Sequence, residues 1–122
     1  MTVRARPFVV LRVAKAGRRR RLAGTMNRLE ARYAELLDAR QAAGEVAEWH
    51  FEALTLKLAR DTRYTPDFMV VLPDGTVELH EVKGFMREDA HVKLKVCALA
   101  FPFTVRVAYY AAKSWQITEV AP

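Results

Sequence analysis

Apolar residues recur at helical spacing in two stretches of the chain. Between residues 27 and 43 they lie three or four positions apart, with alanines between them, at Leu29, Tyr33, Leu36 and Leu37. This spacing predicts a first helix over 27–43, which Gly44 ends. A second helix is predicted over 87–100, ending before Pro102, with Val92, Val96 and Leu99 on one face and Leu94 beside them.

Five other stretches have the composition of strands. Residues 49–58 alternate leucine with polar residues and are predicted as a first core strand. Residues 65–72 and 76–83 are predicted to pair as a hairpin, and 103–110 and 115–120 to form the last two strands. A further β-prone stretch, 8–13, follows Pro7 and is either a short peripheral strand or part of a loose arm. The order helix, three strands, helix, two strands predicts one α/β domain with a central mixed sheet flanked by helices.

The predicted hairpin brings two acidic residues together. Pro73, Asp74 and Gly75 suit the three positions of a hairpin loop with a bulge, which sets Leu72 opposite Thr76. The same register sets Asp67 opposite Glu81, and Lys83 shares their otherwise apolar face because side chains alternate along a strand. Opposed residues have Cβ atoms about 4.5–5.5 Å apart, where like charges destabilise a pair.

Two interpretations of this arrangement are open. Two acids and a lysine at the end of a core-facing surface are explained by a bound hard cation with oxygen ligands, and Mg²⁺ fits best. Alternatively, Asp67 is a turn residue at the start of its strand, and Glu81 and Lys83 form a salt bridge at a solvated edge. The three histidines, His50, His80 and His91, have no metal-binding spacing, and His80 falls on the face opposite Asp67.

Composition limits the classes of function. A length of 122 residues fits one compact domain and leaves no room for a separate cofactor domain. Cys97 is the only cysteine, which excludes an intramolecular disulfide and suits a reducing compartment. No stretch approaches the roughly twenty apolar residues of a membrane helix, and the N-terminus lacks the apolar block of a signal peptide. We therefore expect an intracellular protein with no membrane contact and no organic cofactor.

The net charge of +6 is unevenly distributed. Residues 1–28 contain nine Lys or Arg and no acid, whereas residues 29–122 contain eleven bases and fourteen acids. This division predicts a basic arm over 1–25 and a single domain over 26–122. Such an arm is suited to a polyanion, because each base placed at a phosphate releases a counterion. The alternative is a solvated tail that aids solubility.

A known family combines these features. Pro66-Asp67, thirteen intervening residues and Glu81-Val82-Lys83 form a Pro-Asp, spacer, Glu-x-Lys pattern that resembles the PD-(D/E)XK nuclease superfamily. The predicted order of elements agrees with that restriction-endonuclease-like core. Over residues 27–104 the chain is similar in particular to small phage nucleases of the endonuclease I type and to Holliday-junction resolvases.

The resemblance implies a Mg²⁺-dependent DNA endonuclease, with Mn²⁺ as a substitute, that cuts duplex or branched DNA. It implies that Asp67, Glu81 and Glu30 hold one or two ions, with the Val82 carbonyl as a further ligand, and that Lys83 orients the attacking water. Glu30 has a second interpretation, because Asn27 followed by Glu30 is a capping-box pattern. Some relatives carry a Gln-Pro pair where this chain has Phe51-Glu52-Ala53. Glu52 is therefore a candidate site residue by position alone.

Partners follow from the same resemblance. Basic residues near the predicted site and in the arm are expected to contact phosphates, or else to be solvated: Arg63, Arg87, Lys93, Lys95 and Arg18, Arg19, Arg20 and Arg21. Cutting both strands of a symmetric substrate needs two active sites, so a homodimer is expected. The expected setting is the cytoplasm of a bacterial host, with a phage or prophage origin. The rival functions are a non-catalytic DNA-binding or packaging accessory and a module that binds or cuts RNA.

Overall fold

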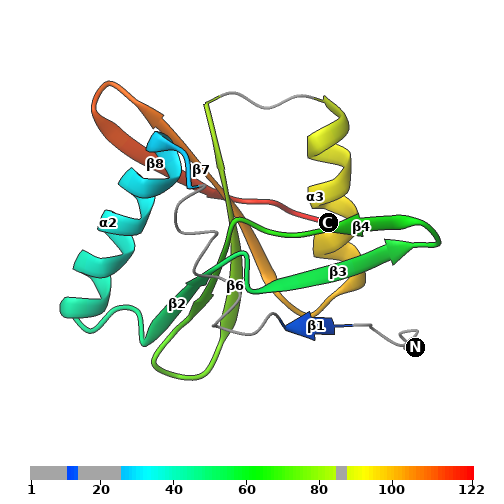
Figure 1. The fold of residues 1–122 in the computed structure, drawn as a ribbon, viewed down its shortest axis with the longest axis horizontal. Helices are drawn as coiled ribbons and strands as arrows, with labels where there is room; N and C mark the ends of the chain where they lie inside the picture. Colours follow the sequence, from blue (N-terminus) through cyan, green and yellow to red (C-terminus); the bar gives the residue numbers. More distant parts are fainter. Residues whose placement is uncertain (1–10, 14–25, 85–87) are drawn as a thin grey trace.

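A computed structural model describes residues 11–13, 26–84 and 88–122. They form a mixed α/β fold around a five-stranded, mostly antiparallel sheet (Figure 1). The strand order of this sheet is β2-β5-β6-β7-β8, and the bounds are β2 Glu48–Phe51, β5 Phe68–Val71, β6 Val77–Lys83, β7 Thr104–Ala111 and β8 Ser114–Glu119. The predicted central mixed sheet with flanking helices is therefore confirmed.

Two helices flank this sheet, close to their predicted bounds. Helix α2 spans Arg28–Ala42, and Asn27 and Glu30 form a capping box at its start. Its C-cap is Ala43, and Gly44 follows in the left-handed region with φ +83°, where glycine meets no steric penalty. Helix α3 spans Glu88–Ala100 and connects β6 to the parallel strand β7. This crossover is the reason that β6 and β7 run in the same direction.

A second, smaller sheet is the main difference from the predicted fold. It has the order β1-β3-β4, with β1 Leu11–Val13, β3 Leu54–Ala59 and β4 Thr62–Tyr64. The single strand predicted over 49–58 is wrong: Glu52, at φ +49°, breaks it into β2 and β3, which belong to different sheets. The strand predicted over 65–72 likewise begins only at Phe68, because the preceding Pro66-Asp67 segment is not in strand conformation. Strand β1 covers residues 11–13 of the β-prone stretch 8–13, whose first three residues lie outside the described part of the chain.

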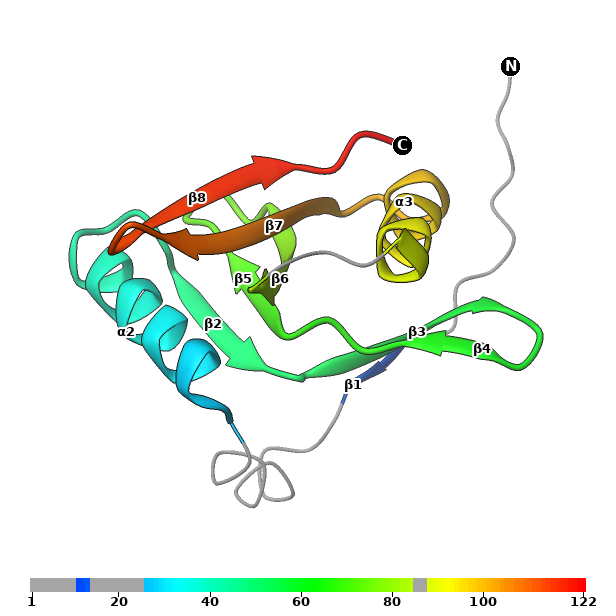
Figure 2. The ribbon, with the colours of Figure 1, turned by 90° about the horizontal axis from the view of Figure 1, so that it is seen from above.

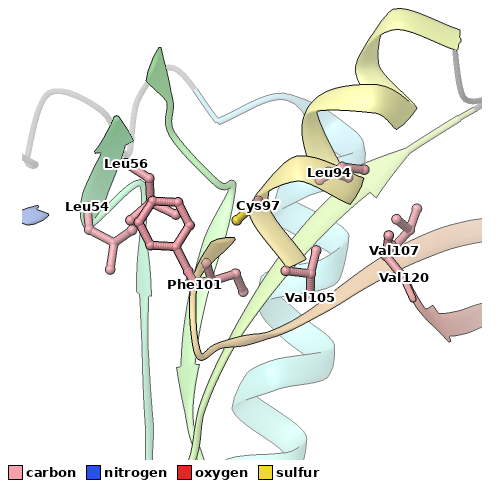
Figure 3. Packing of buried hydrophobic residues seen from close by; sticks show 9 residues of the cluster. Leu54, Leu56, Leu94, Cys97, Phe101, Val105, Val107 and Val120 are labelled. Atoms are coloured by element: carbon pink, nitrogen blue, oxygen red, sulfur yellow. The ribbon is translucent and has the colours of Figure 1, made fainter. Parts of the chain in front are cut away.

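The two helices cover opposite faces of the large sheet (Figure 2). On one face, α2 packs on a core of Tyr33, Leu37, Val46, Phe68, Val70, Val82 and Ala108. On the other face, α3 lies between the sheet and β3, and Figure 3 shows Phe101 beside Leu54 and Leu56 of β3. Alternate residues of β6 therefore enter different cores, with Leu79 in the second and Val82 in the first.

The face of α3 that carries Val92, Val96 and Leu99 is not the buried one. Val92, Val96 and Leu99 are 54%, 37% and 74% exposed, whereas Leu94 and Cys97 are fully buried. The helix carries apolar residues on most of its circumference, so periodicity alone does not select a face. Packing against β3 selects the face of Leu94, Cys97 and the following Phe101.

Candidate active site

The β5–β6 hairpin has the register that the turn chemistry predicts. The backbone N–H of Leu72 donates to Thr76 O at 2.8 Å, that of Gly75 donates to Leu72 O at 2.9 Å, and Gly75 has φ +91°. Phe68 pairs with His80 and Val71 with Val77. Continued by one residue, this pairing sets Asp67 opposite Glu81, as predicted.

Two hydrogen bonds hold Asp67, one to strand β6 and one to the segment between β2 and β3. Its Oδ2 accepts a hydrogen bond from the backbone N–H of Val82 at 2.9 Å. Its backbone carbonyl accepts one from the N–H of Glu52 at 2.8 Å. Glu52, a candidate site residue by its position in the sequence, is thus a neighbour of Asp67, and the contact is made by its main chain. These bonds fix the Asp67 carboxylate at the end of β6, next to Glu81.

Glu81 is buried and has both carboxylate oxygens engaged. Lys83 Nζ lies 3.1 Å from Glu81 Oε2, and the Tyr64 hydroxyl donates to Oε1. This ion pair is the contact that the salt-bridge interpretation predicts, but Glu81 is buried and does not lie at a solvated edge. Tyr64 is a residue that the sequence analysis missed: it belongs to the short strand β4, and its only local signal is its position three residues before Asp67.

The electrostatics of the pair are unfavourable for two charged carboxylates. Burial raises the pKa of Asp67 to about 8, and the charge of Glu81 adds to this effect. Hydrogen bonding from Val82 and the charge of Lys83 oppose the rise, but do not cancel it. One lysine thus does not neutralise the two acids, and a bound cation would remove the remaining repulsion.

Glu30 lies at the start of α2 and makes the capping interaction. Its Oε1 accepts a hydrogen bond from the Asn27 backbone N–H at 2.9 Å, and its own N–H donates to Asn27 Oδ1 at 2.7 Å. Its charge nevertheless contributes to the raised pKa of Asp67. The structure thus gives Glu30 a structural partner and an electrostatic influence on the acidic pair.

The donor atoms present suit a hard cation, although they do not form a complete cage. Within residues 11–13, 26–84 and 88–122, no group of three or more His, Cys, Asp or Glu side chains is arranged to hold a metal ion. Asp67 and Glu81 form a pair of oxygen donors, which is the donor type that Mg²⁺ prefers. Mg²⁺ usually keeps several waters and takes only one or two carboxylates, so a pair meets its requirement.

The predicted phosphate contacts are only partly within the described chain. Lys93 Nζ donates to the backbone carbonyl of Arg63 at 3.3 Å, which brings these two residues together, and Lys95 is exposed on the same helix. Arg87 and the run Arg18–Arg21 lie outside the described residues. Two of the predicted phosphate contacts, Lys93 of α3 and Arg63 of β4, are therefore neighbours in the structure.

A second polar cluster lies on the α2 face of the sheet. His80 is fully buried, with Nδ1 2.6 Å from the Tyr33 hydroxyl and Nε2 2.8 Å from Glu78 Oε1. Arg106 binds both oxygens of Glu78, at 3.1 and 3.2 Å. His80 is thus on the face opposite Asp67, as predicted. Tyr33, Glu78 and Arg106 were missed, because residues far apart in the sequence complete this cluster.

The sequence comparisons place the chain in a family without giving it an activity. No curated protein and no solved structure matches it closely enough to count as a relative. Among the described residues, no helix is long and apolar enough to cross a membrane. The profile of a family described as "Protein of unknown function (DUF1064)" matches residues 26–119. This match covers most of the chain, which therefore belongs to the DUF1064 family.

Proposed function

We propose that the protein is a metal-dependent DNA endonuclease that hydrolyses phosphodiester bonds. The observation that carries this proposal is the pair of facing carboxylates, Asp67 and Glu81, with Lys83 bound to one of them. Glu81 is buried and Asp67 is half-buried, and like charges placed there reduce the stability of a fold, so the pair calls for a role beyond folding. Residues with strongly shifted pKa values are concentrated at functional sites.

The topology around the pair supports a restriction-endonuclease-like core. Helix α2 precedes the β5–β6 hairpin, and α3 then leads to β7, which pairs in parallel with β6. One acidic residue directly before β5 and one in the antiparallel neighbour β6, followed by such a crossover, agree with the arrangement that the PD-(D/E)XK resemblance implies. Strands β1, β3, β4 and β8 are additions to that core.

Asp67 and Glu81 would hold Mg²⁺ or Mn²⁺, with the Val82 carbonyl as a third oxygen donor. The ion would supply a water with a lowered pKa and would polarise the scissile phosphate. Lys83 would orient the attacking water and stabilise negative charge that develops on the phosphate. Glu30, already bonded to the start of α2, would act through its charge from outside the inner set of ligands.

Catalysis would require Glu81 to exchange a partner. Both of its oxygens are engaged, one by Tyr64 and one by Lys83. Release of Lys83 from Glu81 would free one oxygen for the cation and the ammonium group for the water or phosphate. The same engaged oxygens favour the second candidate, a non-catalytic DNA-binding or packaging accessory with a nuclease-like fold.

DNA is the proposed substrate, either duplex or branched. The nine basic residues and absence of acids in residues 1–28 support a polyanionic partner. A homodimer would supply the two active sites that a symmetric junction requires. This substrate would place the protein in the cytoplasm of a bacterial host.

The test is incubation of the protein with supercoiled plasmid and with a four-way junction, each with Mg²⁺, with Mn²⁺ and with EDTA. We expect nicking or junction cutting with either metal and none in EDTA. An RNA of equal sequence, digested in parallel, tests the substrate class. An Asp67→Asn preparation excludes a contaminating nuclease. Metal-independent DNA binding without any cutting would overturn the proposed function and support the accessory role.

A further inference from the structure

A surface pocket of about 430 Å³ lies between α2 and the end of β7. It is lined by Arg28, Ala31, Arg32, Glu35 and Tyr110. Arg28 and Arg32 are one helical turn apart and therefore project from the same side of α2, with Cβ atoms about 5–6 Å apart. None of these residues belongs to the acidic pair or to the individual phosphate contacts predicted from the sequence, although Arg28 is the last of the nine bases in residues 1–28.

Arg32 is held in this pocket by an aromatic ring. Its guanidinium carbon lies 4.6 Å from the centroid of the Tyr110 ring. That ring in turn packs on Trp115, at a centroid distance of 5.0 Å, and Trp115 packs on the buried Tyr33 at 4.8 Å. A stack of rings anchored in the core thus fixes the position of an arginine at the surface.

This kind of support leaves the charge of the arginine available. A guanidinium held by a carboxylate is neutralised, as for Arg106 with Glu78 and Arg40 with Glu45. Within the described part of the chain, Arg28 and Arg32 have no carboxylate at ion-pair distance. Aromatic contact positions a guanidinium while its N–H groups stay free to bind a phosphate in two-point geometry.

The pocket lies at the same end of the sheet as the acidic pair. Lys83 pairs with Tyr109 across β6 and β7, and Tyr110 is the next residue of β7. Glu30, whose charge reaches Asp67, precedes the pocket residue Ala31 in α2. Tyr109 packs with the α3 core, so Tyr110 points to the α2 face. Glu81 faces the α3 side, so a DNA strand would have to pass around the end of the sheet at Lys83 to reach both the acidic pair and the pocket.

We infer that the Arg28–Arg32–Tyr110 pocket binds a backbone phosphate of the DNA strand beside the cleavage site. This inference rests on the proposed function for the identity of the ligand. Phosphate contacts of this kind fix the register of the nucleic acid without reading its sequence. Glu35, on the rim of the pocket, would repel the phosphate and so limit the strength of the contact.

Fluorescence anisotropy with a labelled DNA duplex in EDTA tests the pocket without cleavage. We expect Arg28→Ala together with Arg32→Ala to weaken binding about tenfold and to reduce the salt slope of log K by about two. Tyr110→Leu should weaken binding several-fold by releasing Arg32, whereas Tyr110→Phe keeps the ring and should bind normally. Glu35→Gln should bind more tightly. Arg60→Ala, on the exposed β3–β4 turn far from α2 in both views, is the matched control and should have little effect (Figures 1 and 2).

The outcomes separate this inference from the proposed function. If the wild type cuts DNA but the double variant binds like Arg60→Ala, the pocket is not a phosphate site and the nuclease assignment stands. If the wild type never cuts but the arginine, tyrosine and Glu35 variants change affinity as expected, the pocket is a DNA contact and the nuclease assignment fails. Absence of any DNA binding by the wild type overturns both. Far-UV circular dichroism of each variant confirms that it is folded.

Discussion

The Asp67 carboxylate accepts a hydrogen bond from the backbone N–H of Val82, 2.9 Å away and 15 residues along the chain. This bond holds one acid against the strand that carries the other. The Asp67 carboxylate is therefore positioned by main-chain geometry, and its side chain can be changed without removing the hairpin that supports it.

Asp67→Ala and Lys83→Ala are each expected to reduce DNA cleavage by at least about 100-fold. Asp67→Ala removes a proposed metal ligand, and Lys83→Ala removes the cation that would stabilise charge on the phosphate. DNA binding should stay near the wild-type level, and should be tighter for Asp67→Ala, because a carboxylate that repels phosphate is lost. Plasmid nicking and fluorescence anisotropy measure the two properties. Cutting at the wild-type rate by either variant would contradict the proposed site.

Asp67→Asn should increase the free energy of unfolding, by up to about 1 kcal/mol, in metal-free buffer at neutral pH. The amide keeps an acceptor for the Val82 N–H. Unlike the Asp67 carboxyl, whose pKa is raised to about 8, the amide needs no bound proton to be neutral beside Glu81 at this pH. Urea unfolding followed by circular dichroism measures the change. A gain in stability with a loss of cleavage is typical of a functional site. A destabilised Asn variant would show that the acid has a structural role instead.

The hydrogen bonds of Glu78 predict that the folded protein loses stability in acid. Hydrogen bonds from His80 and Arg106 lower the pKa of Glu78 to about 2, from an ordinary value of 4.5. Because the folded-state pKa is the lower one, the stabilisation is complete above pH 4.5 and is lost as the pH falls toward 2. Wild type should therefore be more stable than Glu78→Gln at pH 6, and the difference should shrink between pH 4.5 and 2.

Urea titrations at several pH values in this range measure that difference. Glu48→Gln is the matched control, because Glu48 is exposed and its contact with His50 is a surface pair worth about 1 kcal/mol or less. A gap between wild type and Glu78→Gln that stays constant down to pH 2 would show that the Glu78 charge does not contribute.

Two leucines of α3 test which face of the helix belongs to the core. Leu94 is fully buried and Leu99 is 74% exposed. Leu94→Ala should cost about 2–5 kcal/mol of unfolding free energy, and Leu99→Ala should change it by about 0.5 kcal/mol or less. Thermal and urea unfolding of both variants measure these values. Equal costs would mean that α3 does not pack as described.

Local chemistry explains what the sequence predicts correctly. The Pro73-Asp74-Gly75 loop defines its own turn, and the turn defines the register, so the meeting of Asp67 and Glu81 follows from residues close to them. The capping box likewise lies within one turn of α2. These features need no knowledge of the rest of the chain.

Tertiary contacts explain what the sequence does not predict. A single left-handed residue, Glu52, sends the chain from one sheet to another, and no periodicity marks it. Tyr64 becomes part of the site only because β4 pairs with β3 and places its hydroxyl at Glu81. The apolar circumference of α3 gives several possible core faces, and packing on β3 decides among them.

Strand β6 has a consequence for how the protein tolerates mutation. Its five central residues are all buried, with Glu81 turned toward one core and Glu78 and His80 toward the other, whereas exposed and half-buried residues alternate along β2. In a saturation mutagenesis screen, β2 should show damaging and harmless positions in turn. Along β6, by contrast, substitutions at every position from Glu78 to Val82 should destabilise the protein, because neither side of the strand faces solvent.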